Sequence, residues 1–339
     1  MRIAYYIAIV FFFLGCRDTP SDGDSKLTTY KNNKVGILCE GNFLWGNAQF
    51  DVWAPDSNLF VDKAFEKANQ KPIGDILQSA FKYGNSLYLV VNNSGLLYAL
   101  NPTTLEVRKR ITGFKSPRYA VAYDGKIYIS DLEANAVSVF DTLTDEVKSI
   151  QILENVDGAR SGWTEEICFW NQQIVAAVND GFLWVFDPRT NSSKLIETDT
   201  GSRYLAIDSR NRLWIGSSSG NQSSLKALNQ NLEVVHAKSW TKEGELTRLS
   251  ASLTGDTLWY IRSGSLTGMS VESIEQEFSK VVPYTNIYGM GIDPNTGEIY
   301  VSDAGDYVSR GRWSVLNPAG DSIIHSGKTG IIPGGFVFF

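Results

Sequence analysis

Histidine and cysteine are scarce in this 339-residue chain, which contains two His and three Cys. So few ligands exclude most His- or Cys-rich metal sites and a disulfide scaffold, although a site built from carboxylates stays open. Basic residues are the minority charge, since 31 Lys and Arg stand against 37 Asp and Glu. We expect no nucleic-acid partner, because binding by counterion release requires a basic face.

Helical signals are also lacking. Met occurs only three times, and no sustained 3.6-residue apolar period follows the first residues, apart from residues 63–80, where we expect a helical turn. By contrast, the chain has 30 Gly, 12% aromatic residues and 43% hydrophobic residues. This composition favours many short strands and tight turns around a sizeable core. We therefore predict a large all-β body.

The one long apolar run lies at the start of the chain. Met1-Arg2 supplies a positive charge, and Ile3–Leu14 is a run of twelve apolar residues. Twelve residues are too few to span a bilayer as a helix, and a charged start followed by an apolar middle describes a signal peptide. We assign the signal peptide to residues 1–15.

The end of this signal resembles a bacterial lipobox. In Phe13-Leu14-Gly15-Cys16 the cysteine would become the diacylated first residue of the mature chain. We therefore predict lipidation at Cys16, with residues 16–33 forming the lipidated cysteine and a flexible tether. The alternative is a plain secretory signal followed by an unrelated cysteine.

The remaining chain, residues 34–339, repeats with a period near forty. Short apolar-aromatic segments follow polar turns, and the starts of six of them are separated by 40, 47, 39, 45 and 41 residues. The segments are Leu87–Val90, Ile127–Ser130, Ile174–Ala177, Leu213–Gly216, Leu258–Ile261 and Ile299–Ser302, and a seventh, Val35–Leu38, lies upstream. This period predicts a β-propeller with four strands per blade and seven blades.

The two ends of the repeat predict how the ring closes. The segment at Val35 lacks an inner strand of its own, and Pro333–Phe339 resembles an inner strand with no blade after it. We expect the C-terminal strand to complete blade one, because closure removes open sheet edges.

Ligands of propellers usually bind where the loops between second and third strands and the loops between blades meet, around the central channel. Trp45, Trp163 and Trp240 lie among Gly, Asn and charged residues, so they are candidates for a flat ligand platform. The full set of candidate ligand-binding residues on these loops is Trp45, Asn92, Arg118, Asp131, Trp163, Arg203, Trp240 and Tyr288.

Each candidate has a structural alternative. Aromatic residues at strand starts often pack between blades, and Asn or Asp in short loops usually satisfies turn geometry. The pair Arg118-Tyr119 recurs as Arg203-Tyr204 at the same blade position. Recurrence favours a salt bridge between blades, although an arginine facing the channel could equally bind a phosphate or carboxylate.

Catalytic patterns are mostly missing. His236 and His325 are expected on outer strands, away from the channel, which excludes a His-based triad or His-ligated metal. Cys39 and Cys168 are expected on strands of different blades, too far apart to form a disulfide. Glu165-Glu166 is interpreted as a solvated strand start. Asp303 and Asp306 are weak candidates for Ca²⁺ ligands, without the spacing of a complete loop motif.

Several short motifs resemble one family. Cys39-Glu40-Gly41-Asn42-Phe43, Gly74–Ser79, Asn92-Asn93-Ser94-Gly95, Ser116–Tyr119 and Pro333–Phe336 resemble the YncE-like propeller lipoproteins of Bacteroidota. Some similar proteins, of the BtuG type, hold cobalamin at the cell surface beside a TonB-dependent transporter. The resemblance therefore implies an outer-membrane lipoprotein with a corrinoid ligand and such a transporter as partner.

Two classes of function remain open. The first is a lipid-anchored envelope protein, on the surface or periplasmic side of the outer membrane. It captures cobalamin, another corrinoid or another sizeable polar-aromatic nutrient in the central cup and hands it to an uptake system. The second is a lactonase-like hydrolase or lyase that uses Asp and Asn around one Ca²⁺. A scaffold for another envelope protein is a third alternative. An enzyme is the less favoured interpretation.

Overall fold

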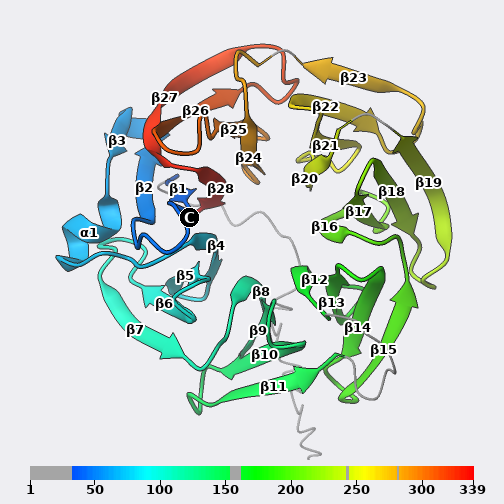
Figure 1. Ribbon diagram of the computed structural model, residues 1–339, viewed down its shortest axis with the longest axis horizontal. Helices are drawn as coiled ribbons and strands as arrows, with labels where there is room; N and C mark the ends of the chain where they lie inside the picture. The colour runs from blue at the N-terminus through cyan, green and yellow to red at the C-terminus, as the bar shows by residue number, and fades with distance from the viewer. Residues whose placement is uncertain (1–32, 153–161, 242–243, 281) are drawn as a thin grey trace, which may run out of the picture.

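The computed structural model describes residues 33–152, 162–241, 244–280 and 282–339. Within these ranges the chain forms 28 β-strands, arranged as seven four-stranded antiparallel sheets in a ring (Figure 1). Helix in these ranges is limited to α1 (Ala64–Asn69) and the short 3-10 helix η1 (Pro55–Ser57). The predicted all-β, seven-bladed propeller is confirmed, and α1 lies where the helical turn was expected.

Each blade runs from an innermost strand at the channel to an exposed outermost strand. Blade one contains β28 (Pro333–Phe338), β1 (Val35–Cys39), β2 (Gln49–Ala54) and β3 (Leu59–Val61). Blade two contains β4 (Leu77–Tyr83), β5 (Ser86–Val91), β6 (Leu96–Leu100) and β7 (Val107–Thr112). Blade three contains β8 (Pro117–Tyr123), β9 (Lys126–Asp131), β10 (Ala136–Asp141) and β11 (Val147–Gln151). Blade four contains β12 (Thr164–Trp170), β13 (Gln173–Val178), β14 (Phe182–Asp187) and β15 (Ser192–Glu197).

The remaining blades follow the same plan. Blade five contains β16 (Ser202–Ile207), β17 (Leu213–Ser219), β18 (Gln222–Leu228) and β19 (Val234–Thr241). Blade six contains β20 (Leu246–Ala251), β21 (Thr257–Arg262), β22 (Ser265–Ser270) and β23 (Glu277–Lys280). Blade seven contains β24 (Ile287–Ile292), β25 (Ile299–Asp303), β26 (Arg310–Leu316) and β27 (Ile323–Ile331). All seven repeated segments of the sequence are second strands.

The turn between β8 and β9 illustrates how local sequence sets the hairpins. Asp124 and Gly125 have φ values of 47° and 73°, so both central residues are left-handed. This conformation matches the right-handed twist of the flanking strands, and Asp-Gly adopts it at little steric cost. The dipeptide therefore fixes the pairing of Tyr123 with Lys126.

The C-terminal strand closes the ring, as predicted. Strand β28 pairs antiparallel with β1, with Val35 opposite Phe338. The closure ends in two backbone hydrogen bonds between Lys34 and Phe339, of 3.0 and 2.9 Å. Val337 and Phe339 are buried against blades one and two. Both ends of the described chain therefore belong to one sheet.

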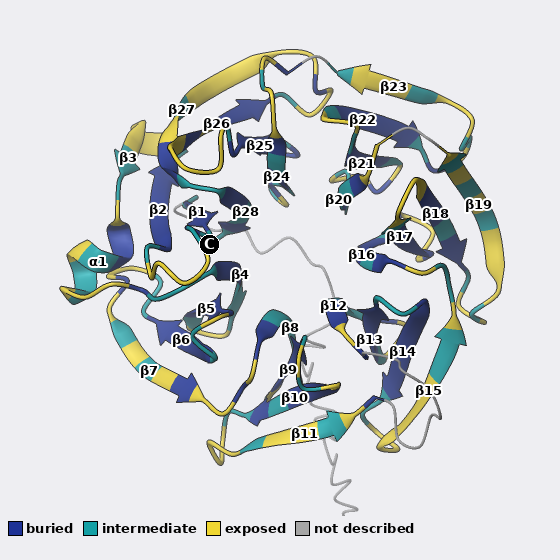
Figure 2. Ribbon diagram, in the orientation of Figure 1, coloured by how far each residue is buried: buried dark blue, intermediate teal, exposed yellow. Residues whose placement is uncertain are grey.

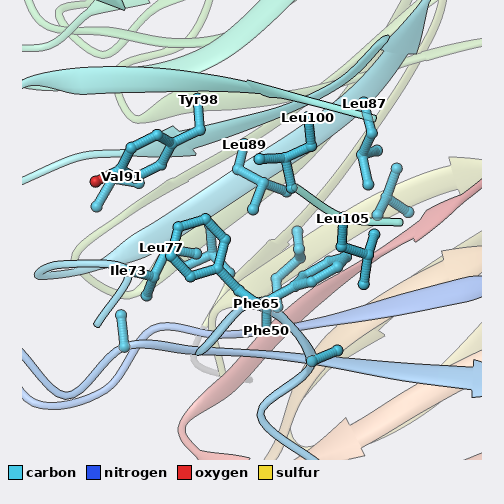
Figure 3. Close-up of a cluster of buried hydrophobic side chains, with 14 of the residues drawn as sticks. Phe50, Phe65, Ile73, Leu77, Leu87, Leu89, Val91, Tyr98, Leu100 and Leu105 are labelled. Atoms are coloured by element: carbon cyan, nitrogen blue, oxygen red, sulfur yellow. The ribbon is translucent and has the colours of Figure 1, made fainter. Parts of the chain in front are cut away.

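The core consists of apolar layers between neighbouring blades. Figure 2 shows the second and third strands mostly buried and the outermost strands mostly exposed. In the layer between blades one and two, Phe50, Phe65 and Leu77 come from three different elements and pack together (Figure 3). Fully burying a side chain of this size contributes about 1.5–3 kcal/mol.

The N-terminal predictions lie outside the described residues, because residues 1–32, including Cys16, are not among them. Of the helices in the described part of the chain, none has the length and apolar character needed to cross a membrane.

Candidate functional site

Every innermost strand carries a β-bulge near its start. The pairing of each innermost strand with its neighbour shifts register there, in all seven blades. The residues that fall within the bulges are Gln78, Arg118 and Tyr119, Glu165 and Glu166, Arg203, Arg248, Tyr288 and Gly334. A bulge re-aims side chains out of the regular alternation of a strand, and bulges are frequent beside functional sites.

The bulge residues meet at the axis of the ring. Arg248 of blade six donates a hydrogen bond of 2.9 Å to the carbonyl oxygen of Gly334 in blade one, which is not its neighbour. The Arg248 charge also acts on the Glu166 carboxyl of blade four. Side chains from blades on different sides of the ring therefore form one polar lining of the channel. We call these bulge residues, together with Glu40, which contacts Tyr288 and Arg248, the channel ring.

One half of the channel ring is an ion-pair group across blades two to five. Arg118 donates two hydrogen bonds to Glu165 Oε2, of 3.0 and 2.8 Å, and a third of 2.8 Å to Gln78 Oε1. Arg203 Nε lies 3.8 Å from Glu165 Oε1, and Arg203 Nη1 lies 3.5 Å from Glu245 Oε1. The predicted alternative of salt bridges between blades is therefore confirmed for both arginines.

The other half of the channel ring joins blades six, seven and one. The Tyr288 hydroxyl donates a hydrogen bond of 3.0 Å to Glu40 Oε2, and Arg248 Nη2 lies 4.0 Å from Glu40 Oε1. The Arg248 guanidinium also lies over the Tyr288 ring, 5.2 Å from its centre. Burial raises the pKa of Glu40, while Arg248 and the Tyr288 hydroxyl act in the opposite direction.

Glu166 is a channel-ring carboxyl with a strongly raised pKa. Burial raises its pKa to about 7, although the Leu205 amide, which donates a hydrogen bond of 2.8 Å to Oε2, and Arg248 oppose that shift. A carboxyl with this pKa can bind and release a proton near neutral pH. Together the ring offers guanidinium donors, phenols and carboxyl groups with raised pKa values to a ligand.

Three of the predicted site residues, Arg118, Arg203 and Tyr288, belong to the channel ring. Two others, Asn92 and Asp131, instead hold loops together. Asn92 Nδ2 donates to the Pro117 carbonyl oxygen over 2.9 Å, and Asp131 accepts from the Lys115 and Ser116 amides over 2.9 and 2.7 Å. Their side chains are buried, in the turn-stabilising role given as the alternative.

The three tryptophans do not come together. Trp45 lies in the loop after β1 and is 76% exposed, and Trp163 precedes β12 and is 45% exposed. The expectation that Trp240 lies in a loop between blades is wrong, because it lies on β19. Its ring packs against Tyr260 of blade six, with the Arg262 guanidinium 5.0 Å from its centre.

The carboxylates of the two calcium candidates accept hydrogen bonds from backbone amides of their own or an adjacent loop. Asp303 Oδ1 accepts from the Asn286 and Gly305 amides, each over 3.0 Å. Asp306 Oδ1 accepts from Val308 and Ser309 amides over 3.0 and 2.6 Å. Within the described ranges, no group of three His, Cys, Asp or Glu residues could hold a metal ion.

The His and Cys expectations agree with the structure. His236 lies on β19 and stacks on Trp214, while His325 lies on β27 beside Trp53. Cys39 and Cys168 are both free thiols on strands of blades one and four.

Sequence reasoning missed five members of the channel ring: Glu40, Gln78, Arg248, Glu165 and Glu166. The interpretation of Glu165-Glu166 as a solvated strand start is wrong, because the Glu165 side chain is only 7% exposed. The available signal was positional: Glu165, Arg203 and Arg118 each follow the first residue of an inner strand, at equivalent places in three blades.

A family model described as "Domain of unknown function (DUF5074)" matches residues 35–310 of this propeller. The chain belongs to this family. A search of the curated proteins finds no match.

Solved structures share the fold at low identity. A quinonprotein alcohol dehydrogenase-like protein from Bacteroides thetaiotaomicron matches with a TM-score of 0.68 and 11% identity, over 89% of this chain and 78% of that one. The periplasmic gluconolactonase of Pseudomonas aeruginosa matches with a TM-score of 0.67 and 14% identity, over 90% and 99% of the two chains. A protein from Lactobacillus plantarum has a TM-score of 0.67 and 9% identity, over 91% and 99%. At these identities the likeness shows the fold alone.

Proposed function

We propose that this member of the family is a lipid-anchored binding protein of the cell envelope that holds a polar ligand in the channel ring. The observation that carries this proposal is the bulge in every innermost strand, which brings Arg118, Arg203 and Arg248 to one axis. Guanidinium groups in such a setting suit a ligand with carboxylate, phosphate or amide oxygens.

Arg203 is the arginine best suited to contact the ligand. Its nearest acidic oxygens lie at 3.5 and 3.8 Å, compared with 2.8 Å between Arg118 and Glu165. Its side chain is 36% exposed, so part of the guanidinium is open to a ligand. A ligand oxygen would therefore gain a charge-assisted hydrogen bond without displacing a close ion pair.

The resemblance to YncE-like lipoproteins supports a corrinoid as the ligand and a TonB-dependent transporter as the partner that receives it. A corrinoid carries peripheral amides and, in cobalamin, a phosphate, which are the groups that Arg203 can bind. The rings of Trp45 and Trp163 are exposed and would offer flat apolar surface to such a ligand.

Titration of the mature protein with cobalamin by calorimetry tests the ligand. We expect wild type to bind and Arg203→Ala to bind at least tenfold more weakly, with Arg189→Ala, in an exposed turn of blade four, as the unchanged control. Trp163→Ala should weaken binding roughly thirtyfold if the ring is a central contact, since such residues contribute about 2 kcal/mol or more. If wild type releases or absorbs no heat on titration, cobalamin is not the ligand. If Arg203→Ala binds as tightly as wild type, the binding site does not lie in the channel ring.

The anchor is tested separately. Cys16→Ala should release the protein from the membrane fraction into the soluble fraction, because the diacylated residue is lost. A variant that still sediments with membranes would contradict lipidation at Cys16.

A second candidate is lactone hydrolysis, which two observations favour. Glu166 has a pKa of about 7, suitable for a general base at neutral pH, and one structural neighbour is named a gluconolactonase. Hydrolysis of δ-gluconolactone above the spontaneous rate, lost in Glu166→Gln, would favour this activity. Rates equal to buffer, with and without Ca²⁺, would eliminate it.

A further inference from the structure

A second concave site lies away from the channel ring, at one end of blade five. It is a cavity of ≈ 510 Å³ between the end of the β-sheet and the loop that joins β15 to β16. This volume falls in the range of small-molecule sites, about 300–1,000 Å³. Its chemistry differs from that of the channel ring, because its wall is made mainly of hydroxyl and amide side chains.

Two cross-strand rows of polar residues form the wall. Directly paired residues share one face of an antiparallel sheet. One row consists of Ser217, Ser224 and Ser239, and the other of Ser219, Gln222 and Thr241. Each row crosses β17, β18 and β19 in turn. Neighbouring positions in a row are therefore separated by about 4.8 Å, the spacing between strands.

Comparison with blades two and four shows what fills the equivalent space there. The positions of Ser217 and Ser224 correspond to Val91 and Leu96 in blade two and to Val178 and Phe182 in blade four. Those apolar residues are buried and pack in the layers between blades. Serines at these positions leave the same space unfilled and line it with hydroxyls.

Asp199 adds a charged acceptor to this wall. Its carboxylate accepts hydrogen bonds of 2.6 Å from both Ser224 Oγ and Lys226 Nζ. Although burial by itself raises the pKa of Asp199, these two bonds lower it overall, so the group is ionised at neutral pH. The carboxylate has lone pairs left for a further donor.

The row of Ser219, Gln222 and Thr241 has side-chain donors and acceptors without a protein partner in the described parts of the chain. Across the parts of the chain that the structure describes, the side chains of Ser219, Gln222 and Thr241 make no hydrogen bond to another protein group, whereas Ser217 and Ser224 do. Groups of this kind that line a concave surface are satisfied by water or by a ligand with hydroxyls.

We propose that this cavity binds a saccharide unit. A pyranose presents alternating hydroxyls at a spacing comparable to that between strands, so it can bond to several side chains of the rows at once. The Asp199 carboxylate would accept a hydrogen bond from a hydroxyl group, and the negative charge disfavours anionic ligands. The wall is mainly polar, with Trp240 as its one aromatic residue, which separates this site from the channel ring.

Saturation-transfer NMR on the mature protein tests the proposal, with glucose, galactose and N-acetylglucosamine as probes. We expect at least one probe to receive saturation from wild type. The double variant Ser217→Val with Ser224→Leu places the residues of blade two in blade five and should lower affinity at least tenfold. Its melting temperature should stay close to that of wild type, because blade two accommodates the same pair.

Two further variants guard against a folding defect. Asp199→Asn keeps the size of the side chain and should weaken binding at least fivefold, because a charged acceptor becomes neutral. Ser149→Leu, on the exposed β11 of blade three, is the matched serine control and should bind as wild type does. The proposal is overturned if no probe receives saturation, or if both the filled variant and Asp199→Asn bind as tightly as wild type.

Discussion

Arg118 on β8 and Glu165 on β12 join two neighbouring blades through a single carboxylate oxygen, which accepts hydrogen bonds from both Nε and Nη2 of the arginine. The residues are 47 positions apart in the chain, and the Glu165 side chain is nearly fully buried. Arg203 of blade five approaches the other oxygen of the same carboxylate. Glu165 therefore connects three blades at the channel.

Removal of the Glu165 charge should destabilise the propeller. Glu165→Ala leaves two guanidinium groups without their shared acid, and breaking such a partly buried pair costs about 3 kcal/mol. Urea unfolding measures this change. Glu146→Ala is the matched control, because its pair with Lys148 is solvent-exposed and contributes little to stability. Equal unfolding free energies for the two variants would contradict a structural role for Glu165.

The stability of the protein should fall as the pH rises from about 4.5 to 7. The folded state raises the pKa of Glu166 from its ordinary 4.5 to about 7, so in this window it binds more protons than the unfolded state does. Deprotonation of the buried carboxyl then costs stability, on the order of 1–3 kcal/mol. Glu40 contributes in the same direction, since burial also raises its pKa.

Glu166→Gln isolates this contribution. The glutamine resembles the protonated acid, so the variant should lose less stability than wild type between pH 5 and pH 8. Chemical unfolding at the two pH values provides the measurement. An unchanged difference between them would show that Glu166 does not titrate in this window.

Deletion of residues 334–339 should abolish folding rather than trim a tail. The deletion removes most of β28, exposes the edge of β1 and takes two buried side chains, Val337 and Phe339, out of the core. An open strand edge also promotes aggregation. Circular dichroism and size-exclusion chromatography check the outcome, and a truncated protein with the wild-type melting transition would refute the closure.

Trp45 and Trp240 should respond in opposite ways to replacement by alanine. Trp45→Ala should change the unfolding free energy by no more than about 0.5 kcal/mol, because its ring is exposed. Trp240→Ala removes the contact with Tyr260 and should cost about 2–3 kcal/mol. Thermal unfolding of both variants measures the contrast. A larger loss for Trp45 than for Trp240 would contradict the packing described.

Much of the fold could be predicted from the sequence because each blade repeats a local pattern. The second strands at Val35, Leu87 and Ile127 follow polar turns. When short strands of this kind repeat with a period near forty residues, the common architecture is a β-propeller. The unmatched ends at Val35 and Pro333 predicted the closure, since a strand without a partner needs one.

The candidate site was less predictable. Alternation along a strand assigns each side chain to a face, but the extra residue of a bulge breaks that alternation. Glu165 therefore looked like a solvated position, although its side chain enters the channel ring. The turn-rich sequence around Trp240 indicated a loop. In the structure β19 continues to Thr241, so Trp240 lies on a strand.

The sequence by itself determined the number of blades, the order of their strands and the way the ring closes, because these follow from hydrophobic alternation and turns over a few residues. Only the tertiary structure decided which polar side chains meet. Glu40 and Tyr288 are 248 residues apart, yet they share a hydrogen bond at the channel. Closure of the ring brings blades one and seven together, and the bulges turn the side chains inward. No local pattern in the sequence pairs these two residues with each other.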